Sequence, residues 1–141
     1  MTEAQALIDA NVILRFLLGD NERQSPIAHR TFQAIERGEV RAETTATVIL
    51  EAVHVMTSVC KMDRKVVADR ISGLLQIGNF AVEHRTALAE ALELWLTYKR
   101  LSFPDALHLV IAGMARHKTI VSFDRGLDRC LAGVTRVEEF P

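Results

Sequence analysis

The chain has 141 residues, of which 49% are hydrophobic and 25% charged, and its formal net charge is −1. This length and ordinary composition predict one soluble globular domain over residues 1–141, since domains usually span roughly 100–200 residues. A nearly neutral chain has no global attraction to nucleic acid. Any binding of that kind must therefore come from a local group of basic side chains.

Cysteine usage and the apolar runs indicate the compartment. Cys60 and Cys130 are isolated, without a CxxC pair or the spacing of a disulfide framework, which favours two reduced thiols in a cytosolic protein. Glu3 and Asp9 interrupt the apolar stretch that a signal peptide needs. The longest apolar runs, such as ALHLVIAGMA, fall short of the roughly 20 residues that span a membrane. We therefore expect a cytoplasmic protein that does not engage a membrane.

The hydrophobic pattern predicts short strands alternating with helices. Strands are expected at residues 5–9, 39–44, 80–83, 119–124 and 135–140. Helices are expected at residues 11–18, 26–37, 47–61, 64–77, 85–100, 103–117 and 125–131. Such alternation is typical of an α/β domain with a mainly parallel sheet, although the pattern does not reveal the order of the strands.

Boundary residues add detail to several of these elements. Ser25 is expected to cap the second helix, with Pro26 at its first position and Gly38 as its stop. Asp63 is expected to cap the fourth helix. The helix at 103–117 is apolar nearly all round, which predicts a central and buried position.

Four acids stand where a parallel sheet can bring side chains together. Asp9 and Asp124 end predicted strands. Asp105 lies in the first turn of the helix at 103–117, and Glu51 lies early in the helix after the second strand. Sites in open parallel sheets form beyond the carboxyl ends of the strands, and right-handed connections return helix starts to that edge. We therefore expect the four carboxylates to meet on one rim.

Each acid also has a purely structural interpretation. Aspartate is a common N-cap where a strand turns into a helix, which applies to Asp9 and Asp124. Asp105 would complement the positive end of its helix. Glu51 belongs to a polar stripe at helical spacing that is typical of a solvated face. The stripe consists of Thr47, Glu51, His54, Ser58 and Lys61.

The combination favours a metal site over separate structural roles. Three predicted helix starts carry aspartate rather than serine or threonine, and their neighbours are apolar. Ionised carboxylates crowd together only around a cation, because their mutual repulsion would otherwise raise some of their pKa values. Carboxylate oxygens suit Mg²⁺ or Mn²⁺, and such ions promote phosphoryl transfer to water. The pattern indicates a metal-dependent hydrolase.

The chain resembles the PIN-domain ribonucleases and, among them, the VapC-type toxins of bacterial toxin–antitoxin modules. Four segments carry the resemblance, in the order found in the family: DANVILRFLLGD, TTATVILEAVHVM, FPDALHL and VSFDRGL. The resemblance implies a three-layer α/β/α sandwich with a short, mainly parallel central sheet. It also implies a divalent-metal-dependent endoribonuclease whose catalytic, metal-binding acids are Asp9, Glu51, Asp105 and Asp124.

The resemblance also suggests a role for each site residue. It makes Asp9 and Asp105 the foremost candidates for direct metal ligands, with Glu51 and Asp124 completing the site directly or through water. Asn11 matches the amide that follows the first acid in the family and would orient a carboxylate or a phosphate. Ser122 stands where the family more often has threonine, so a supporting hydroxyl is kept.

RNA must be held despite the neutral total charge. Arg15 is the one charge in its helix and a candidate RNA contact. Further candidates for phosphate contacts are Arg23, Lys99, Arg100, Arg116, Lys118, Arg125 and Arg129. The resemblance implies two protein partners as well. One is an antitoxin that docks an amphipathic helix in a groove and covers the site, and the other is a second copy of the chain.

Product chemistry separates two mechanisms. In-line attack by metal-activated water leaves 5′-phosphate and 3′-hydroxyl ends, whereas a histidine-based ribonuclease leaves cyclic phosphates. Of the five histidines, only His108 is well placed, one turn after Asp105, and a core histidine is the alternative.

Three other functions are alternatives to the toxin ribonuclease. A haloacid-dehalogenase-type phosphatase would need an acid where Asn11 stands, so the sequence disfavours it. A non-catalytic PIN-fold binding module and a stand-alone RNA-processing nuclease remain alternatives.

Overall fold

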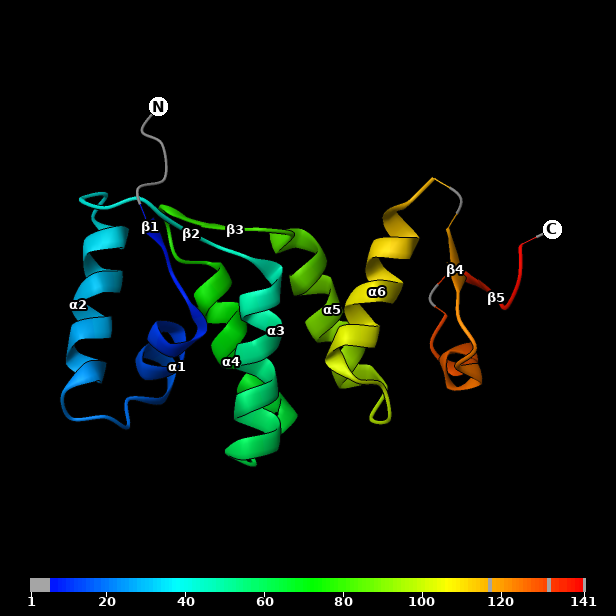
Figure 1. Ribbon diagram of the computed structural model, residues 1–141, viewed down its shortest axis with the longest axis horizontal. Coiled ribbons are helices and arrows are strands. Elements are labelled where there is room, and N and C mark those ends of the chain that lie inside the picture. The colour runs from blue at the N-terminus through cyan, green and yellow to red at the C-terminus, as the bar shows by residue number, and fades with distance from the viewer. Residues whose placement is uncertain (1–5, 117, 132, 141) are drawn as a thin grey trace. The chain divides into compact units, whose positions relative to one another are not determined.

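The computed structural model describes residues 6–116, 118–131 and 133–140, so Gln5 of the first predicted strand lies outside the described residues. The chain divides into two compact units, Met1–Arg85 and Thr86–Pro141, and each is described by itself. The first unit contains β1 (Ala6–Leu7), α1 (Ala10–Leu18), α2 (Gln24–Glu36), β2 (Ala42–Thr44), α3 (Ala46–His54), the π-helical turn η1 (Val55–Val59), α4 (Arg64–Leu75) and β3 (Phe80–Val82). The second contains α5 (Arg85–Thr97) except for its first residue, α6 (Phe103–Met114), β4 (Thr119–Val121), the 3₁₀ helix η2 (Arg125–Arg129) and β5 (Thr135–Val137) (Figure 1).

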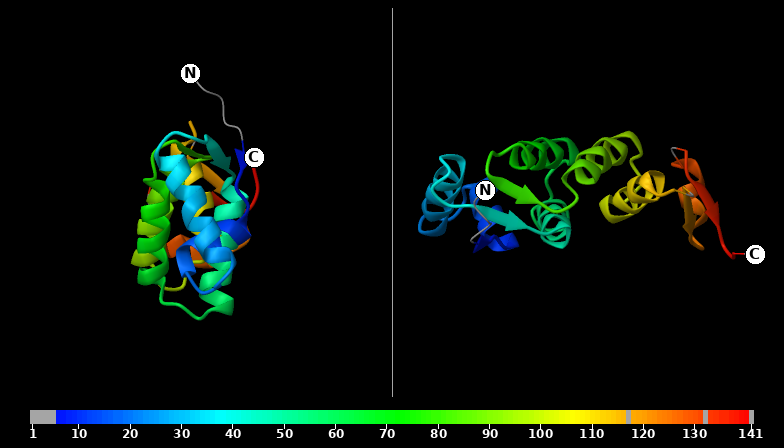
Figure 2. Two further views of the ribbon diagram at one scale, coloured as in Figure 1. Left: turned by 90° about the vertical axis from the view of Figure 1, so that its left-hand side faces the viewer. Right: turned by 90° about the horizontal axis from the view of Figure 1, so that it is seen from above.

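A parallel sheet organises the first unit. Its order is β1-β2-β3, with Ala42 of β2 opposite both Ala6 of β1 and Phe80 of β3. Figure 2 (right) shows β2 and β3 side by side and running in the same direction. Parallel strands need crossover connections, and here helices supply them. The predicted α/β class with a parallel sheet is confirmed.

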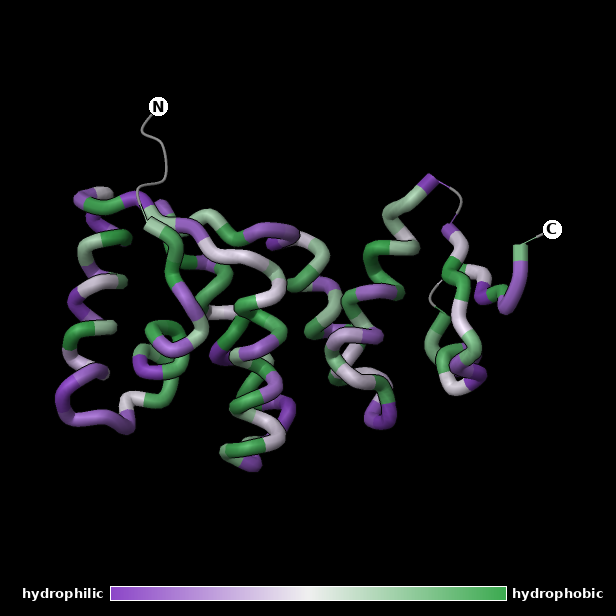
Figure 3. The backbone as a smooth tube through the Cα atoms, viewed as in Figure 1, coloured by the Kyte–Doolittle hydropathy of each residue, from purple (hydrophilic) through white to green (hydrophobic). Residues whose placement is uncertain are grey.

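Aromatic side chains join the helices of the first unit to its sheet. Phe32 of α2 stacks on Phe16 of α1 with ring centroids 4.3 Å apart. It also meets Phe80 of β3 edge to face, at 5.3 Å. Phe32 and Phe80 are each only 1% exposed. Hydrophobic and hydrophilic residues alternate along α2 in Figure 3, as expected for a helix that buries one face.

The start of α2 differs from the prediction. The helix begins at Gln24, and the hydroxyl of buried Ser25 accepts a hydrogen bond from the Asn21 N–H at 3.2 Å. The Asn21 carboxamide oxygen accepts from the Arg23 and Gln24 N–H groups, at 3.1 and 2.7 Å. The prediction of Ser25 as N-cap was wrong because an asparagine just upstream satisfies the first free amides instead. Gly38 does end this region, with φ of +76°.

The helix after β2 also departs from its predicted form. Thr45 caps α3 by accepting from the Val48 N–H at 3.2 Å. The α-helix ends at His54 and continues as the π-helical turn η1, in which the Cys60 N–H bonds the Val55 carbonyl at 2.9 Å. Hydrophobic periodicity does not separate these two forms of helix over so short a stretch.

The second unit places a helix pair before a parallel strand pair. Trp95 of α5 packs on Phe103 of α6 with ring centroids 5.5 Å apart, and β4 pairs in parallel with β5. The prediction of a central, buried helix at 103–117 was wrong for its last turns, since Ile111 is 39% and Met114 52% exposed and α6 ends at Met114. His117 lies outside the described residues. Within the described parts of both units, no helix is long and apolar enough to cross a membrane.

Candidate active site

Asp9 lies at the turn from β1 into α1. Its carboxylate accepts a hydrogen bond from the Val12 N–H at 3.2 Å and so caps the helix. The strand end before it is held by the buried Thr44, whose hydroxyl donates to the Ile8 carbonyl at 2.7 Å. The Asp9 side chain remains exposed. The capping interpretation and the ligand interpretation are therefore compatible, because one carboxylate has two oxygens.

Asp9 and Asn11 line the same cavity, which measures about 290 Å³. Arg15 also lines it and joins α1 to the start of α2. Its guanidinium donates to the Gln24 side-chain oxygen at 3.1 Å and pairs with Asp20 at 3.2 Å. The structure thus brings three of the sequence-predicted residues together in the first unit.

Glu51 is not among the residues that line this cavity. It lies on the exposed face of α3. The whole stripe to which the sequence assigned it is exposed, namely Thr47, Glu51, His54, Ser58 and Lys61. The description of that stripe as a solvated face is confirmed, and a solvated face leaves Glu51 free to meet a ligand.

Asp105 occupies the first turn of α6 without capping it. Ser102 is the cap, and its hydroxyl accepts from the Asp105 N–H at 3.2 Å. The premise that aspartate begins this helix in place of serine was therefore wrong. The Asp105 side chain is 40% exposed and lies 3.9 Å from the Nδ1 atom of His108, which is itself 61% exposed. His108 is thus a surface residue and not a core histidine.

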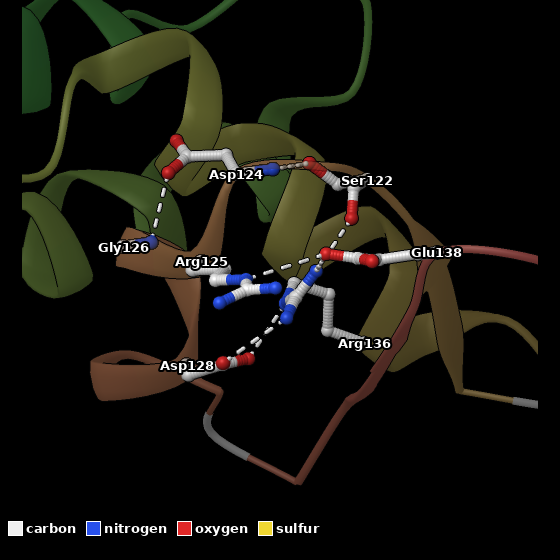
Figure 4. Close-up of polar contacts among 7 residues, drawn as sticks. All are labelled: Ser122, Asp124, Arg125, Gly126, Asp128, Arg136 and Glu138. Carbon is white, nitrogen blue, oxygen red and sulfur yellow. Dashed lines mark hydrogen bonds and ion pairs between the residues drawn. The ribbon is translucent and has the colours of Figure 1, made fainter.

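Asp124 is held from both sides at the start of η2 (Figure 4). Its carboxylate accepts from the Gly126 N–H at 2.8 Å, and its own N–H donates to the Ser122 hydroxyl at 3.0 Å. A Cβ atom on Gly126 would stand 2.9 Å from the Asp124 carboxylate oxygen, closer than real side chains approach. A side chain at position 126 would therefore have to displace the Asp124 carboxylate from this position. The sequence did not single out Gly126.

An arginine network anchors the segment that carries Asp124 (Figure 4). Arg136 of β5 makes two hydrogen bonds to the Asp128 carboxylate, at 2.6 and 3.1 Å. It also donates to the Ser122 carbonyl at 2.6 Å and pairs with Glu138 at 3.3 Å. The hydrogen bond from Arg136 holds the pKa of Asp128 below its usual range. Sequence reasoning missed Arg136 because its partners lie on other elements.

A second cavity, of about 500 Å³, brings Asp105 and Asp124 together within the second unit. Lys99, Arg100 and Arg129 line it as well. Carboxylates in an open cavity suit a hard cation such as Mg²⁺, which usually takes one or two carboxylates and keeps several waters. Asp105 and Asp124 thus supply two oxygen ligands of the type that this ion prefers, in a cavity that three basic residues also line.

The described residues contain no group of three or more His, Cys, Asp or Glu side chains that could hold a metal ion. Of the four sequence-predicted acids, Asp9 and Glu51 belong to the first unit. Asp105 and Asp124 belong to the second.

Comparison with known proteins identifies the family to which this chain belongs. Asp9 lies two residues beyond the end of β1, Asp124 lies three residues beyond the end of β4, and Asp105 lies in the first turn of α6, in an α/β protein. Residues 6–130 match the PIN domain, and the chain therefore belongs to the PIN-domain family. It is 28% identical over 125 residues to VapC ribonuclease Mb1869c of Mycobacterium bovis and to Ribonuclease VapC13 of Mycobacterium tuberculosis, covering 86% of this chain and 92% of each relative. A VapC ribonuclease of Aquifex aeolicus is 29% identical over 119 residues, 84% of this chain and 87% of the relative.

Proposed function

We propose that the protein is a divalent-metal-dependent endoribonuclease and acts as the toxin of a toxin–antitoxin pair. The observation that carries the proposal is the cavity that Asp105 and Asp124 line together, in a chain of the PIN-domain family. The names of the relatives support the finer assignment, since all three are called VapC ribonucleases.

The cofactor in this proposal is Mg²⁺ or Mn²⁺, which supplies an activated water and stabilises charge on the entering and leaving oxygens. In the second unit, Asp105 and Asp124 would hold the ion. In the first unit, Asp9 and Glu51 are the other two carboxylates that the proposal assigns to catalysis and metal binding. Of these, Asp9 and Asp105 are assigned as direct ligands. Hydrolysis of the phosphodiester leaves a 5′-phosphate and a 3′-hydroxyl.

The remaining residues orient these carboxylates and the RNA. Asn11 lines the cavity of Asp9 and donates from its amide to a phosphate or a carboxylate. Ser122 fixes the backbone of Asp124 through its hydroxyl. Arg15 is assigned as an RNA contact because it lines the same cavity as Asp9.

The proposal includes a cytoplasmic setting and two protein partners. An antitoxin covers the acidic site and keeps RNA away from it, and a second copy of the chain forms a homodimer. Single-domain organisation over residues 1–141 is part of the same proposal, since the PIN match runs through both units.

The test is cleavage of total bacterial RNA by the purified protein, with Mg²⁺ or with EDTA, followed by capture of fragments that carry 5′-phosphates. We expect fragments with Mg²⁺ and none with EDTA, and we expect Asp124→Asn to remove them. Asp69→Asn is the matched control, because that carboxylate pairs with Lys65 on the surface of α4. Cleavage that persists in EDTA, or fragments that end in cyclic phosphates, would contradict the proposal.

A further inference from the structure

The cavity of the second unit is lined by more than acids. Lys99 and Arg100 come from the segment between α5 and α6, and Arg129 comes from the end of η2. All three residues are exposed. Within residues 6–116, 118–131 and 133–140, none of the three takes part in an ion pair.

Their charge is therefore available to a ligand. Two other basic residues of the same unit are paired with carboxylates, since Arg136 pairs with Asp128 and Arg125 with Glu138. In the cavity, by contrast, three basic residues and two acidic residues belong to the same lining. Even before a metal binds there, the cavity lining is net positive, although the whole chain carries −1.

We propose that Lys99, Arg100 and Arg129 form a phosphate-binding wall that holds the RNA backbone next to the phosphate that is cleaved. This inference rests on the proposed function, because it takes RNA as the ligand of the cavity. Lysine and arginine contacts to phosphate set position and affinity but carry no sequence information. The wall therefore fixes the position of the RNA strand relative to Asp105 and Asp124, and it does not select the RNA sequence.

The physical signature of the wall is salt dependence. Each phosphate contact on a single strand contributes a slope of roughly −0.7 to the logarithm of the binding constant against the logarithm of salt concentration. Loss of three contacts should therefore flatten that slope by about 2. Because phosphates are the same in every sequence, the flattening should be equal for oligo-U and oligo-A.

The experiment measures binding of fluorescent 12-nucleotide oligo-U and oligo-A to the full chain in EDTA, across a series of salt concentrations. Four proteins are compared: wild type, Lys99→Ala/Arg100→Ala/Arg129→Ala, the charge-preserving Lys99→Arg/Arg100→Lys/Arg129→Lys, and a control. The control, Arg30→Ala/Arg37→Ala/Lys65→Ala, removes the same charge from exposed positions of the first unit. Far-UV circular dichroism checks that each variant is folded.

We expect the flatter slope only in the alanine variant of the wall, with the wild-type slope in the charge-preserving variant and in the control. Three results would contradict the proposed wall. They are an unchanged slope in the alanine variant of the wall, an equal flattening in the control, and no salt-dependent binding by the wild type. Binding is measured without divalent metal, so it is independent of catalysis. If the variants bind RNA as expected but the wild type never cleaves it, only the proposed function is refuted. If the wild type cleaves RNA but the alanine variant of the wall binds it with the wild-type slope, only the wall is refuted.

Discussion

Asp9 has two roles that substitution can separate. Its carboxylate caps α1 through the 3.2 Å bond to the Val12 N–H, and it is also assigned as a metal ligand. Asparagine caps helices about as well as aspartate does, whereas alanine does not cap them. Asp9→Ala should therefore cost about 1 kcal/mol of unfolding free energy, and Asp9→Asn a few tenths at most. In a chain of this size the alanine variant should melt roughly 4 °C lower.

The RNA-cleaving activity of the two variants should depend on the charge at position 9 and not on the stability of the fold. Both variants lose the negative ligand, so both should cleave RNA at least roughly 100-fold more slowly, which corresponds to about 2.7 kcal/mol of transition-state stabilisation. Thermal denaturation and Mg²⁺-dependent cleavage of the same preparations measure the two effects. An asparagine variant with wild-type activity would show that Asp9 is only a cap. An alanine variant as stable as wild type would refute the magnitude assigned to that cap.

Two further predictions concern the segment around η2. Gly126→Ala should lower the cleavage rate roughly 100-fold with little loss of fold, because the new Cβ would stand 2.9 Å from the Asp124 carboxylate and displace it. The control Gly73→Ala meets nothing within 4 Å in α4 and should gain about 0.5 kcal/mol of stability with unchanged activity. The pKa of Asp128 should be below its usual range in NMR titration and should rise towards that range in Arg136→Gln. Because a lowered pKa favours the charged form in the folded state, this interaction stabilises the fold at neutral pH and is lost as the pH falls through the folded-state pKa.

Each of these predictions can fail in a definite way. Wild-type activity in Gly126→Ala would mean that the bond to Asp124 does not set the geometry of the site. An Asp128 titration that is unchanged by loss of the Arg136 guanidinium would remove that arginine as the cause of the lowered pKa.

Local chemistry explains which parts of the fold could be predicted. The start of α1 after Asp9 and the helix stop at Gly38 depend on a few neighbouring residues, and the sequence contains those residues. The strand before Asp9 is shorter than predicted, since β1 ends at Leu7. Choices between adjacent candidates were less secure. Asn21 took the capping role expected of Ser25, and Ser102 took the start of α6, because several residues in one short stretch could bond the same free amides.

Long-range contacts explain what could not be predicted. Arg136 reaches Asp128 eight residues away and the Ser122 carbonyl fourteen residues away, and no short motif records such a pairing. Gly126 matters only because its neighbour's carboxylate folds back over it. The positions of Asp105 and Asp124 were readable from the sequence as acids at element boundaries. Their shared cavity required the fold of the second unit.

The most direct test of the central claim is a map of new RNA 5′-monophosphate ends in bacterial cells that express either the wild type or Asp105→Asn. The substitution keeps the backbone bond to Ser102 and removes one charge from the cavity. A metal-dependent toxin ribonuclease should arrest growth and produce a few sharp new ends, all absent with Asp105→Asn. The same ends from both proteins, or none from soluble wild type, would contradict catalysis by this site.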